Sequence, residues 1–514
     1  MGKKYLLKIE TAGIQKYIFG TNKLKVNLGA SYIVEHLLFK SLLREAVGKV
    51  FSEDSAKCVD NWFSIQEVKN IIGSDEFKIG YIGGGNAVLL AQDKGRLKYL
   101  EKYFKKLVLQ YFPGIEIYSG IVEEEDSFKD TASSLSKKVN ENRSKNPFIN
   151  FTPNHGFFNK CGVSGGVATH YWEDEKLWIS DEVKSKIQYA EGKHKANKQH
   201  ELDLLTKDEK KQYTFPLNFE DFSTKEDKAY IAIVHIDGNN LGQAFIDADS
   251  LEKTQELSLK VRAIGTKALK ATIQEGLIGR IKINSFDDKF LKKKSDKTYL
   301  PIRPFITGGD DITFICEGTL GIPLAKLFLQ KFHSIGKELS LLEGKVHACA
   351  GVAIVKQKYP FYRAYKLSEE LIGEAKKVSR NNRGSYLSVM VAGYGTGTSL
   401  KDLRNKYAKE ELYNKAFKVV GDSSNNPSLE SLEKLIHTFT EEEDGQRIIP
   451  KNKLIEVRHA LATDTIDDVW PVVNSRLKSS IFDPIEDRSL VFEAIELMDF
   501  YHKAFLTSKI EDHA

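Results

Sequence analysis

One order of predicted secondary-structure elements occurs twice in this chain of 514 residues. In the first half, a strand pattern at 4–10 is followed by helical spacing at 28–49, and Gly83-Gly84-Gly85 then separates two short strand patterns at 78–82 and 87–90. Glycines between two short strands are typical of a β-hairpin. The elements predicted next are a helix at 94–110, a strand at 115–122 and a helix at 127–142.

The second half repeats this order around a different turn. An apolar run over 230–237 ends in a carboxylate, Asp237, and Gly308-Gly309-Asp310-Asp311 separates two later strand patterns. The other elements are predicted as a helix at 251–275, strands at 304–307 and 312–316, a helix at 322–342, a strand at 347–355, a helix at 361–378 and a strand at 386–391. This duplication predicts an α+β fold with two palm-like domains of the ferredoxin-like or nucleotidyl cyclase type.

We expect four parts along the chain: 1–150 as a first palm-like domain with a degenerate site, 151–228 as a connector, 229–395 as a second palm-like domain with the active site, and 396–514 as a helical C-terminal domain. Lys, Glu, Asp and Gln dominate 180–228, so we expect a solvated, charged insertion there. Its closely spaced basic residues form a candidate surface for a regulatory protein or RNA: Lys193, His194, Lys195, Lys198 and His200.

Composition limits the location and the partners of the chain. The formal net charge is +5, which does not by itself indicate a nucleic-acid-binding protein. The four cysteines form no CxxC pair, which argues against a zinc ribbon and fits a reducing cytoplasm. No apolar run reaches the roughly 20 residues that span a bilayer. We therefore expect a soluble cytoplasmic protein without a membrane partner.

Three carboxylates mark the second hairpin as the candidate active site. Asp310 and Asp311 stand in its turn, and Asp237 ends a strand that would bring it to the same sheet edge if the strands are neighbours. Phosphoryl transfer from a nucleotide uses a divalent metal, and Mg²⁺ prefers oxygen ligands. We expect Asp237, Asp310 and Asp311 to be catalytic and to hold Mg²⁺ or Mn²⁺, with Gly238 as a further ligand. Taken alone, the hairpin also fits a simple tight turn with a polar tip.

The residues around these acids are predicted to bind the phosphates of a nucleotide. Glycines let phosphates approach the backbone closely, and the loop after Asp237 leads into a helix whose first amides can cradle a phosphate. A lysine late on the 361–378 helix can reach the phosphates. The predicted nucleotide-binding residues are Gly238, Asn239, Asn240, Leu241, Gly242, Phe245, Gly308, Gly309 and Lys376.

Several stretches of both halves match motifs of a known family. In the second half they are Ile236-Asp237-Gly238-Asn239-Asn240-Leu241-Gly242 and Thr307-Gly308-Gly309-Asp310-Asp311-Ile312-Thr313-Phe314. In the first half they are Gly13-Ile14-Gln15-Lys16-Tyr17-Ile18, Leu28-Gly29-Ala30-Ser31-Tyr32 and Gly83-Gly84-Gly85-Asn86. Over 1–175 and 228–395 the chain resembles the large polymerase/cyclase subunit of type III CRISPR effector complexes, whose second palm carries a GGDD hairpin.

The resemblance implies a function and several partners. It implies that the palms convert ATP into cyclic oligoadenylates or related adenylate signals of antiviral defence, with guide or target RNA and other effector-complex subunits as partners. The family's HD nuclease dyad and the zinc-binding cysteines between the palms are missing, which fits a compact or stand-alone relative. Asn239 stands where an acid is often found, and Glu10 and Asn86 occupy the places of Asp237 and the hairpin acids in the first palm. That palm should support the site without chemistry.

Other functions compete with this hypothesis. The main alternative is a scaffold subunit that binds RNA and neighbouring proteins with weak or no catalysis, although an intact Gly-Gly-Asp-Asp turn favours the enzyme. A GGDEF-type diguanylate cyclase fits less well, because Asp311-Ile312 replaces the Glu-Phe ending. A template-copying polymerase would need fingers and a thumb that the sequence does not indicate. The sequence leaves open base preference, product linkage, and whether the chain acts alone, as a homodimer or inside an RNA-guided complex.

Overall fold

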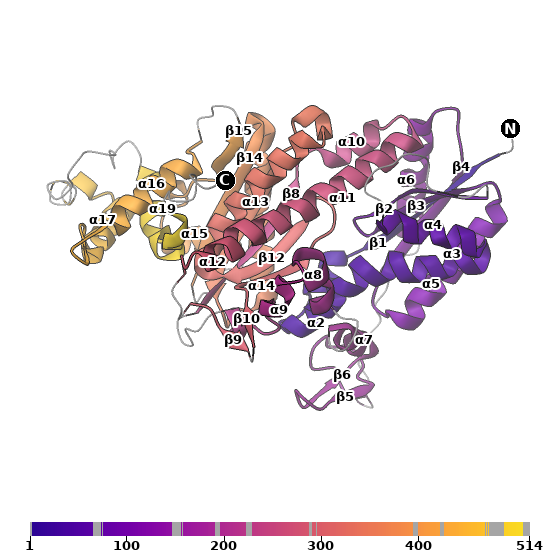
Figure 1. The fold of residues 1–514 in the computed structure, drawn as a ribbon, viewed down its shortest axis with the longest axis horizontal. Coiled ribbons are helices and arrows are strands. Elements are labelled where there is room, and N and C mark those ends of the chain that lie inside the picture. The colour runs from indigo at the N-terminus through magenta and orange to yellow at the C-terminus, as the bar shows by residue number, and fades with distance from the viewer. Residues whose placement is uncertain are drawn as a thin grey trace.

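The computed structural model of the chain describes residues 3–64, 76–145, 158–190, 196–222, 229–286, 290–294, 296–393, 399–421, 426–467 and 488–506, together with 73, 156, 469 and 471. Along the long axis of the molecule, the N-terminal sheet and its helices lie at one end. A larger sheet occupies the middle, and the C-terminal helices lie at the other end (Figure 1).

A four-stranded antiparallel sheet, in the order β2-β3-β1-β4, organises the N-terminal region. Its strands are β1 (Tyr5–Ala12), β2 (Phe77–Gly83), β3 (Asn86–Ala91) and β4 (Glu116–Glu123). Side chains alternate between the two faces of β1, so Leu6 packs with Leu135 on one face while Leu7 and Ile9 join the main core on the other. The helices are α1 (Ile14–Phe19), α2 (Leu24–Tyr32), the π-helix η1 (Ile33–Leu42), α3 (Leu43–Val50), α4 (Glu53–Ser64), α5 (Lys94–Tyr111) and α6 (Phe128–Lys145).

A six-stranded sheet, in the order β11-β12-β8-β13-β14-β15, forms the middle of the molecule. Its strands are β8 (Tyr230–Gly238), β11 (Ile302–Ile306), β12 (Ile312–Glu317), β13 (Ala348–Lys356), β14 (Gly384–Ala392) and β15 (Phe417–Gly421). β13 and β14 are parallel and the other neighbours are antiparallel. The helices are α10 (Leu241–Asp247), α11 (Leu251–Ile273), η3 (Gln274–Gly279), α12 (Arg280–Lys282), η4 (Gly318–Leu320), α13 (Gly321–Glu338), η5 (Leu341–Gly344) and α14 (Phe361–Asn382).

Much of the region between the two sheets is packed against the core. Its elements are β5 (His170–Trp172), β6 (Leu177–Ile179), α7 (Asp181–Ala190), α8 (Ala196–Leu204), α9 (Glu209–Gln212), β7 (Tyr213–Thr214) and η2 (Phe219–Phe222), and β7 pairs with β10 (Lys297–Tyr299) beside β9 (Lys293–Lys294). Leu204, Phe215 and Phe222 are buried in the main core. The prediction of a solvated insertion is therefore wrong for these parts of 180–228, because a few apolar side chains all face the core although charged residues dominate the composition.

The predicted basic surface in this region is also corrected in part. His200 is buried, with only 3% of its surface exposed, so it cannot belong to a surface for RNA or a partner protein. Lys193, His194 and Lys195 lie outside the described residues.

The C-terminal region is mostly helical, as its pattern predicts, but it also completes the larger sheet. β15 pairs with β14 in an antiparallel arrangement and forms the edge of that sheet. The sequence analysis did not predict this short strand. The remaining elements are α15 (Leu400–Tyr407), η6 (Glu410–Leu412), α16 (Leu429–Thr440), β16 (Glu442–Glu443), β17 (Gln446–Arg447), α17 (Lys451–Thr463), α19 (Arg488–Leu497), η7 (Met498–Phe500) and η8 (Lys503–Phe505).

The two large sheets share one topology. In each, the first strand of the region lies between the second strand of a hairpin and a later strand, which gives β2-β3-β1-β4 and β11-β12-β8-β13. After β1 and β8, the chain turns through a left-handed residue that caps the next helix, Gly13 with φ of 63° and Asn240 with φ of 60°. Glu10 and Asp237 each stand three residues before that cap, so they are equivalent positions.

Helix α11 and aromatic contacts join the two regions. On α11, the Gln255 side-chain amide donates a hydrogen bond to the Ile79 carbonyl oxygen of β2. Further along that helix, Arg262 donates to the Trp62 carbonyl oxygen over 2.8 Å. The ring of Phe19 stacks on Tyr365 of α14, with centroids 3.9 Å apart. The two sheets consequently share one continuous hydrophobic core.

Candidate active site

The hairpin turn between β11 and β12 meets the end of β8. Ile312 pairs with Ile236, so Asp310 and Asp311 lie beside the end of the strand that carries Asp237. The contact is close at Gly238, where an added Cβ atom would lie 2.9 Å from the Asp310 Cβ. The adjacency of strands that the sequence argument required is therefore present, and all three carboxylates lie at one sheet edge.

Asp310 carries a charge that its surroundings do not compensate. Burial, followed by the charge of Asp237, raises the pKa of Asp310 to about 7. Burial also raises the pKa of Asp237, although Lys376 opposes that shift. Carboxylates gathered in a partly buried place disfavour one another's charged form unless a cation joins them. The arrangement therefore favours the binding of a cation.

Two cationic or ionisable side chains already stand beside the acids. The Lys376 ammonium, from α14, forms an ion pair with the Asp237 carboxylate. His235 Nε2 lies 3.2 Å from Asp311 Oδ1. Burial by itself would lower the pKa of His235, but Asp311 raises it above its ordinary value. Sequence reasoning missed His235, although the alternation of side chains along β8 places it on the same face as Asp237.

Asn239 is engaged in the structure of the site. Its side-chain amide donates to Ser379 Oγ over 2.8 Å, and Ser379 in turn donates to the Gly384 carbonyl oxygen. The Asn239 backbone N–H donates to the His347 carbonyl oxygen over 2.8 Å. Asn239 thus ties the loop after β8 to α14 and to the β13–β14 end of the sheet. Its side-chain amide is engaged in this hydrogen bonding and does not act as a metal ligand.

Contacts from two other elements fix the hairpin turn. Glu35, on η1, accepts hydrogen bonds from the Thr307 backbone N–H at 2.5 Å and from Thr307 Oγ1 at 3.2 Å. On the other side, α11 approaches so closely at Gly265 that an added Cβ would lie 1.9 Å from the Gly309 carbonyl oxygen. Gly309 itself has a φ of 71°, which suits glycine. The turn is therefore positioned by the N-terminal region as well as by its own sheet.

The remaining predicted nucleotide-binding residues lie at the start of α10. Leu241 is buried and packs below the loop, whereas Gly242 has open space around it. The ring of Phe245 packs against Tyr81 of β2, with centroids 5.7 Å apart. Phe245 thus contacts the N-terminal sheet, and its role in nucleotide binding stays a prediction, as do those of Gly238, Asn240, Gly242, Gly308 and Gly309.

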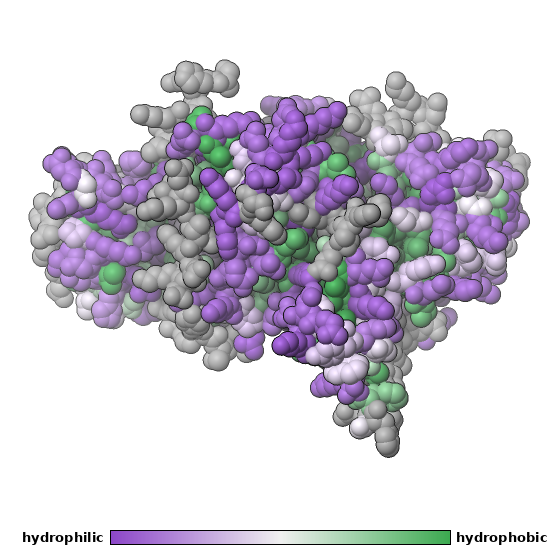
Figure 2. All heavy atoms as spheres, turned by 60° about the horizontal axis from the view of Figure 1, so that its bottom comes forward, coloured by the Kyte–Doolittle hydropathy of each residue, from purple (hydrophilic) through white to green (hydrophobic). Residues whose placement is uncertain are grey.

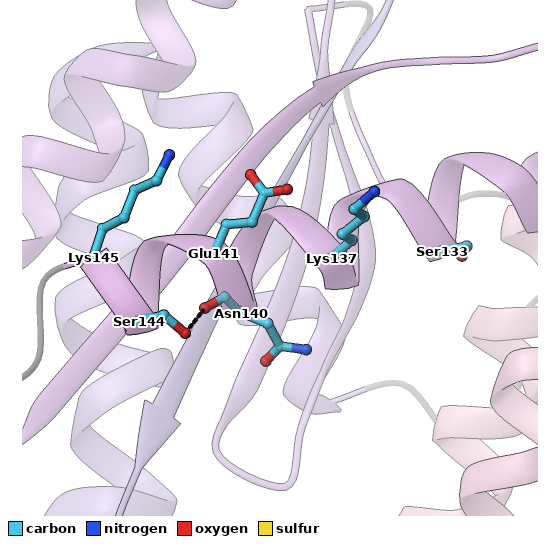
Figure 3. A pocket seen from close by; sticks show the side chains of 6 residues that line it. All are labelled: Ser133, Lys137, Asn140, Glu141, Ser144 and Lys145. Atoms are coloured by element: carbon cyan, nitrogen blue, oxygen red, sulfur yellow. Dashed lines mark hydrogen bonds between the residues drawn. The ribbon is translucent and has the colours of Figure 1, made fainter.

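A separate shallow pocket lies on α6, away from the aspartates. Figure 3 shows its lining along one side of that helix, where Ser144 Oγ donates to the Asn140 carbonyl oxygen over 3.0 Å. Its polar lining is Ser133, Lys137, Asn140, Glu141, Ser144 and Lys145. These side chains bring no cluster of metal-binding groups together, so we do not assign the chemistry to this pocket.

The surface is largely polar. On the face shown in Figure 2, hydrophilic residues predominate and hydrophobic ones appear in scattered areas between them. Among the described residues, no helix has both the length and the hydrophobicity needed to cross a bilayer.

Comparison with known proteins identifies a domain family for one part of the chain. Residues 230–384 match the second palm domain of Cas10/Cmr2. No curated protein sequence matches the chain. The fold is similar to that of a Csm1–Csm4 cassette chain in complex with cA4, with 13% identity and a TM-score of 0.55 over 97% of this chain and 70% of that one.

Two further solved structures have similar values. The cassette in complex with one ATP gives 14% identity and a TM-score of 0.56, over 98% of this chain and 70% of that one. The Csm1–Csm4 subcomplex of the type III-A CRISPR-Csm interference complex gives 15% identity and a TM-score of 0.55, over 97% and 70%. Residues 230–384, which hold the three aspartates, are therefore a second palm domain of the Cas10/Cmr2 family, in a chain whose fold is like that of Csm1 over nearly its whole length.

Proposed function

We propose that this chain is a metal-dependent nucleotidyltransferase or cyclase that converts ATP into a cyclic oligoadenylate or a related adenylate second messenger in CRISPR-type antiviral defence. The observation that carries the proposal is the gathering of Asp237, Asp310 and Asp311 at one edge of a Cas10/Cmr2 palm sheet. The similar cassettes that hold ATP and cA4 support a nucleotide substrate and a product of this class.

The chemistry of the three acids fits Mg²⁺ or Mn²⁺. Both ions prefer oxygen ligands, and Mg²⁺ usually takes one or two carboxylates while phosphates and water fill the other positions. Asp237, Asp310 and Asp311 would hold the ion, with the Gly238 carbonyl as a further ligand. A bound ion would neutralise the triphosphate and make the attacking hydroxyl more acidic. The raised pKa of Asp310 supports this assignment, because a cation relieves the repulsion that causes part of it.

The chain's own residues would orient the nucleotide. Lys376 stands beside Asp237, where its ammonium balances one carboxylate and can donate to a phosphate bound at the same edge. Gly308 and Gly309 keep the turn free of side chains, so that a phosphate can approach the backbone. His235 holds Asp311 from within the sheet. These residues position charge for a transfer in which most of the protein's contribution is electrostatic.

We further propose that 1–150 is a palm-like domain that performs no chemistry and that 151–228, 229–395 and 396–514 are the connector, the catalytic palm and the C-terminal domain. The shared strand order supports the first assignment. Glu10, at the position equivalent to Asp237, is ion-paired with both Lys8 and Arg143. Its charge is therefore already balanced by two cations, which leaves little attraction for a metal.

The decisive experiment is a product assay. Purified chain is incubated with each nucleoside triphosphate and Mg²⁺ or Mn²⁺, and the products are identified by mass spectrometry. We expect adenylate oligomers from ATP, and a nucleotide–Mn²⁺ complex with the ion at Asp237 and Asp310. An ion held by Glu10 instead, or the absence of any product in the presence of activating target RNA and partner subunits, would contradict the proposal.

A second candidate function is a scaffold subunit with weak or no catalysis. The likeness to Csm1 extends over 97% of the chain, beyond the palm that would do the chemistry, and the similar chains are bound to a Csm4 subunit. We infer that guide or target RNA and other effector subunits are partners under either function. Co-purification of the chain with a neighbouring subunit and RNA, together with no product in the assay above, would support the scaffold role. Recovery of the chain free of both would oppose it.

A further inference from the structure

Three metal-binding side chains meet outside the aspartate site. Glu35 and His36 lie on η1, and His200 lies on α8, 164 residues further along the chain than His36. One ligand atom from each falls within 4.8 Å of the others, and among the described residues no other group of three or more such side chains meets this condition. The cluster therefore brings distant parts of the chain to one point.

The two imidazoles in this cluster have buried nitrogen atoms without a partner. His36 Nε2 and His200 Nδ1 are both buried and make no hydrogen bond within the protein. His200 is only 3% exposed, so water from the surface does not reach it freely. Leaving a buried polar atom unsatisfied costs about 1–3 kcal/mol, and an unpartnered group in a native protein commonly marks a bound water or ion.

The three ligand atoms lie within 4.8 Å of one another, which is wider than a bound ion requires, so an ion would draw them together. Ligand atoms about 2.0–2.2 Å from a tetrahedral Zn²⁺ lie roughly 3.4 Å from one another. His36 Nε2 lies 3.8 Å from Glu35 Oε2, so a contraction of a few tenths of an ångström would bring this pair into range. Two histidines and one glutamate are also a ligand set found in zinc proteins that keep one position open.

The surroundings suit neutral imidazole ligands. Burial disfavours the charged form of all three side chains: it lowers the pKa of His36 and of His200 and raises that of Glu35, so an ion bound here would displace a proton from Glu35. A metal requires neutral imidazole. The charged neighbours are Asp311 and Asp203 near Glu35, Lys40 near His36, and Arg303 near His200. Because these neighbours include both acidic and basic side chains, the net charge at the site depends mainly on the three ligands themselves.

We propose that Glu35, His36 and His200 form a binding site for a divalent transition-metal ion such as Zn²⁺, distinct from the aspartate site. Glu35 also accepts two hydrogen bonds from Thr307, which directly precedes the Gly-Gly-Asp-Asp turn. An ion at this site ties η1 and α8 to the base of the catalytic hairpin. Imidazole ligands select Zn²⁺ over Mg²⁺, whereas the aspartates select the reverse. The proposal is independent of the reaction proposed above.

Zinc binding by the full chain tests the proposal. Metal-free protein is titrated with Zn²⁺ against a chromophoric chelator, and the ion retained after dialysis is counted by elemental analysis. We expect one Zn²⁺ per chain in the wild type and in the Asp310→Ala, Asp311→Ala double variant. His36→Gln and His200→Gln should weaken binding at least a hundredfold, whereas His437→Gln, on the exposed face of α16, should not change it.

Two further measurements keep the result decisive. Thr307→Val removes one of the two donors to Glu35 and should weaken Zn²⁺ binding about tenfold, as expected for a group that orients a ligand. Zn²⁺ should raise the melting temperature of the wild type and of the double variant, whereas Mg²⁺ should not raise that of the double variant, which lacks two of the proposed Mg²⁺ ligands. If His200→Gln does not fold, zinc binding by the wild type and by the Asp310→Ala, Asp311→Ala double variant decides whether the site exists. No zinc in the wild type, or zinc lost with the aspartates, overturns the proposal.

Discussion

The ends of β1 and β8 occupy the same place in two sheets of the same topology, yet they handle negative charge in opposite ways. Glu10 is the equivalent of Asp237, and it is ion-paired with Lys8 and Arg143, which lower its pKa although burial alone would raise it. Asp237 also has a cation, Lys376, but Asp310 in the hairpin turn beside it has none of its own, and its pKa rises to about 7.

The hairpins differ in the same sense. Asn86 pairs with Glu10 across the N-terminal sheet, whereas in the larger sheet Asp311 directly precedes Ile312, which pairs with Ile236. Under the proposed function, the same strand order serves as support where its charges are balanced and as a metal site where they are not. The following predictions test this difference.

The largest effect is expected from removing the unbalanced charges. Asp310→Ala with Asp311→Ala should lower product formation at least about a hundredfold, because the loss of metal-based charge stabilisation raises the barrier by several kcal/mol. The variant should keep the fold, because both acids lie at a turn and their removal takes away charge rather than core packing. Initial rates of ATP consumption and circular dichroism measure the two effects.

A matched double variant controls for the change in net charge. Asp54→Ala with Asp208→Ala removes two acids whose side chains are 82% and 83% exposed, and it should leave the rate unchanged. Equal turnover by the wild type and the Asp310, Asp311 variant would place the chemistry elsewhere.

The second effect is a dependence of stability on pH. The pKa of Asp310 rises from 3.8 to about 7 on folding, so between these values the folded chain binds more protons than the unfolded chain. Stability from this residue is therefore complete below about pH 4 and is lost as the pH rises through 7. In chelator, the free energy of unfolding of the wild type should fall by about 1–3 kcal/mol relative to Asp310→Asn between pH 4.5 and 7.5.

Urea unfolding at several pH values measures this difference. Asp54→Asn, an exposed acid on α4, is the control and should give a curve parallel to that of the wild type. If the free energies of unfolding of the wild type and Asp310→Asn changed in parallel with pH, the charge of Asp310 would be screened by solvent. The idea of an uncompensated charge at the hairpin would then be wrong.

The third effect concerns Lys376, the cation that partly balances Asp237. Lys376→Ala should strengthen Mn²⁺ binding to the nucleotide-free protein a few-fold, because it removes a competing positive charge. It should raise the KM for ATP about tenfold, because a charged hydrogen bond to phosphate is worth roughly 1.5 kcal/mol or more. Lys377→Ala, on the exposed side of the same helix, is the matched control. If Mn²⁺ binding became weaker while the KM for ATP rose, or if Mn²⁺ binding became tighter while the KM fell, this role would be contradicted.

The smallest effect is expected in the N-terminal sheet. Arg143→Ala removes one of the two partners of Glu10, and Arg143 is 40% exposed. An ion pair of this exposure contributes about 0–1 kcal/mol, so stability and product formation should both change little. Thermal unfolding and the rate assay measure this. A large loss of activity would show that the end of β1, where Glu10 is ion-paired, takes part in the chemistry.

Local patterns in the sequence predict much of this molecule. Both hairpins, the strand that ends in Asp237 and the Gly-Gly-Asp-Asp turn follow from apolar runs punctuated by glycine, because these signals lie within a few residues of one another. The contacts that position the site are of another kind. Glu35 reaches Thr307 across 272 residues, and His235 meets Asp311 only because β8 and β12 pair in one register.

The errors have the same origin. The stretch 180–228 looks solvated in composition, but Phe215 and Phe222 are enough to anchor its part 196–222 in the core. Strand β15 is five residues long, and its pairing with β14 determines its conformation more than its own sequence does. Neither pairing partner nor burial can be derived from a short window of residues.

The close approach of α11 to the hairpin has a consequence for sequence variation. Gly265 has no reactive group, yet any other residue there would place a carbon atom 1.9 Å from the Gly309 carbonyl oxygen, which neither helix nor turn can accommodate without moving. In a library in which every position is varied and active clones are selected, position 265 should tolerate as few substitutions as the aspartates. Selection for function would then mark a residue whose contribution is the space that it leaves empty.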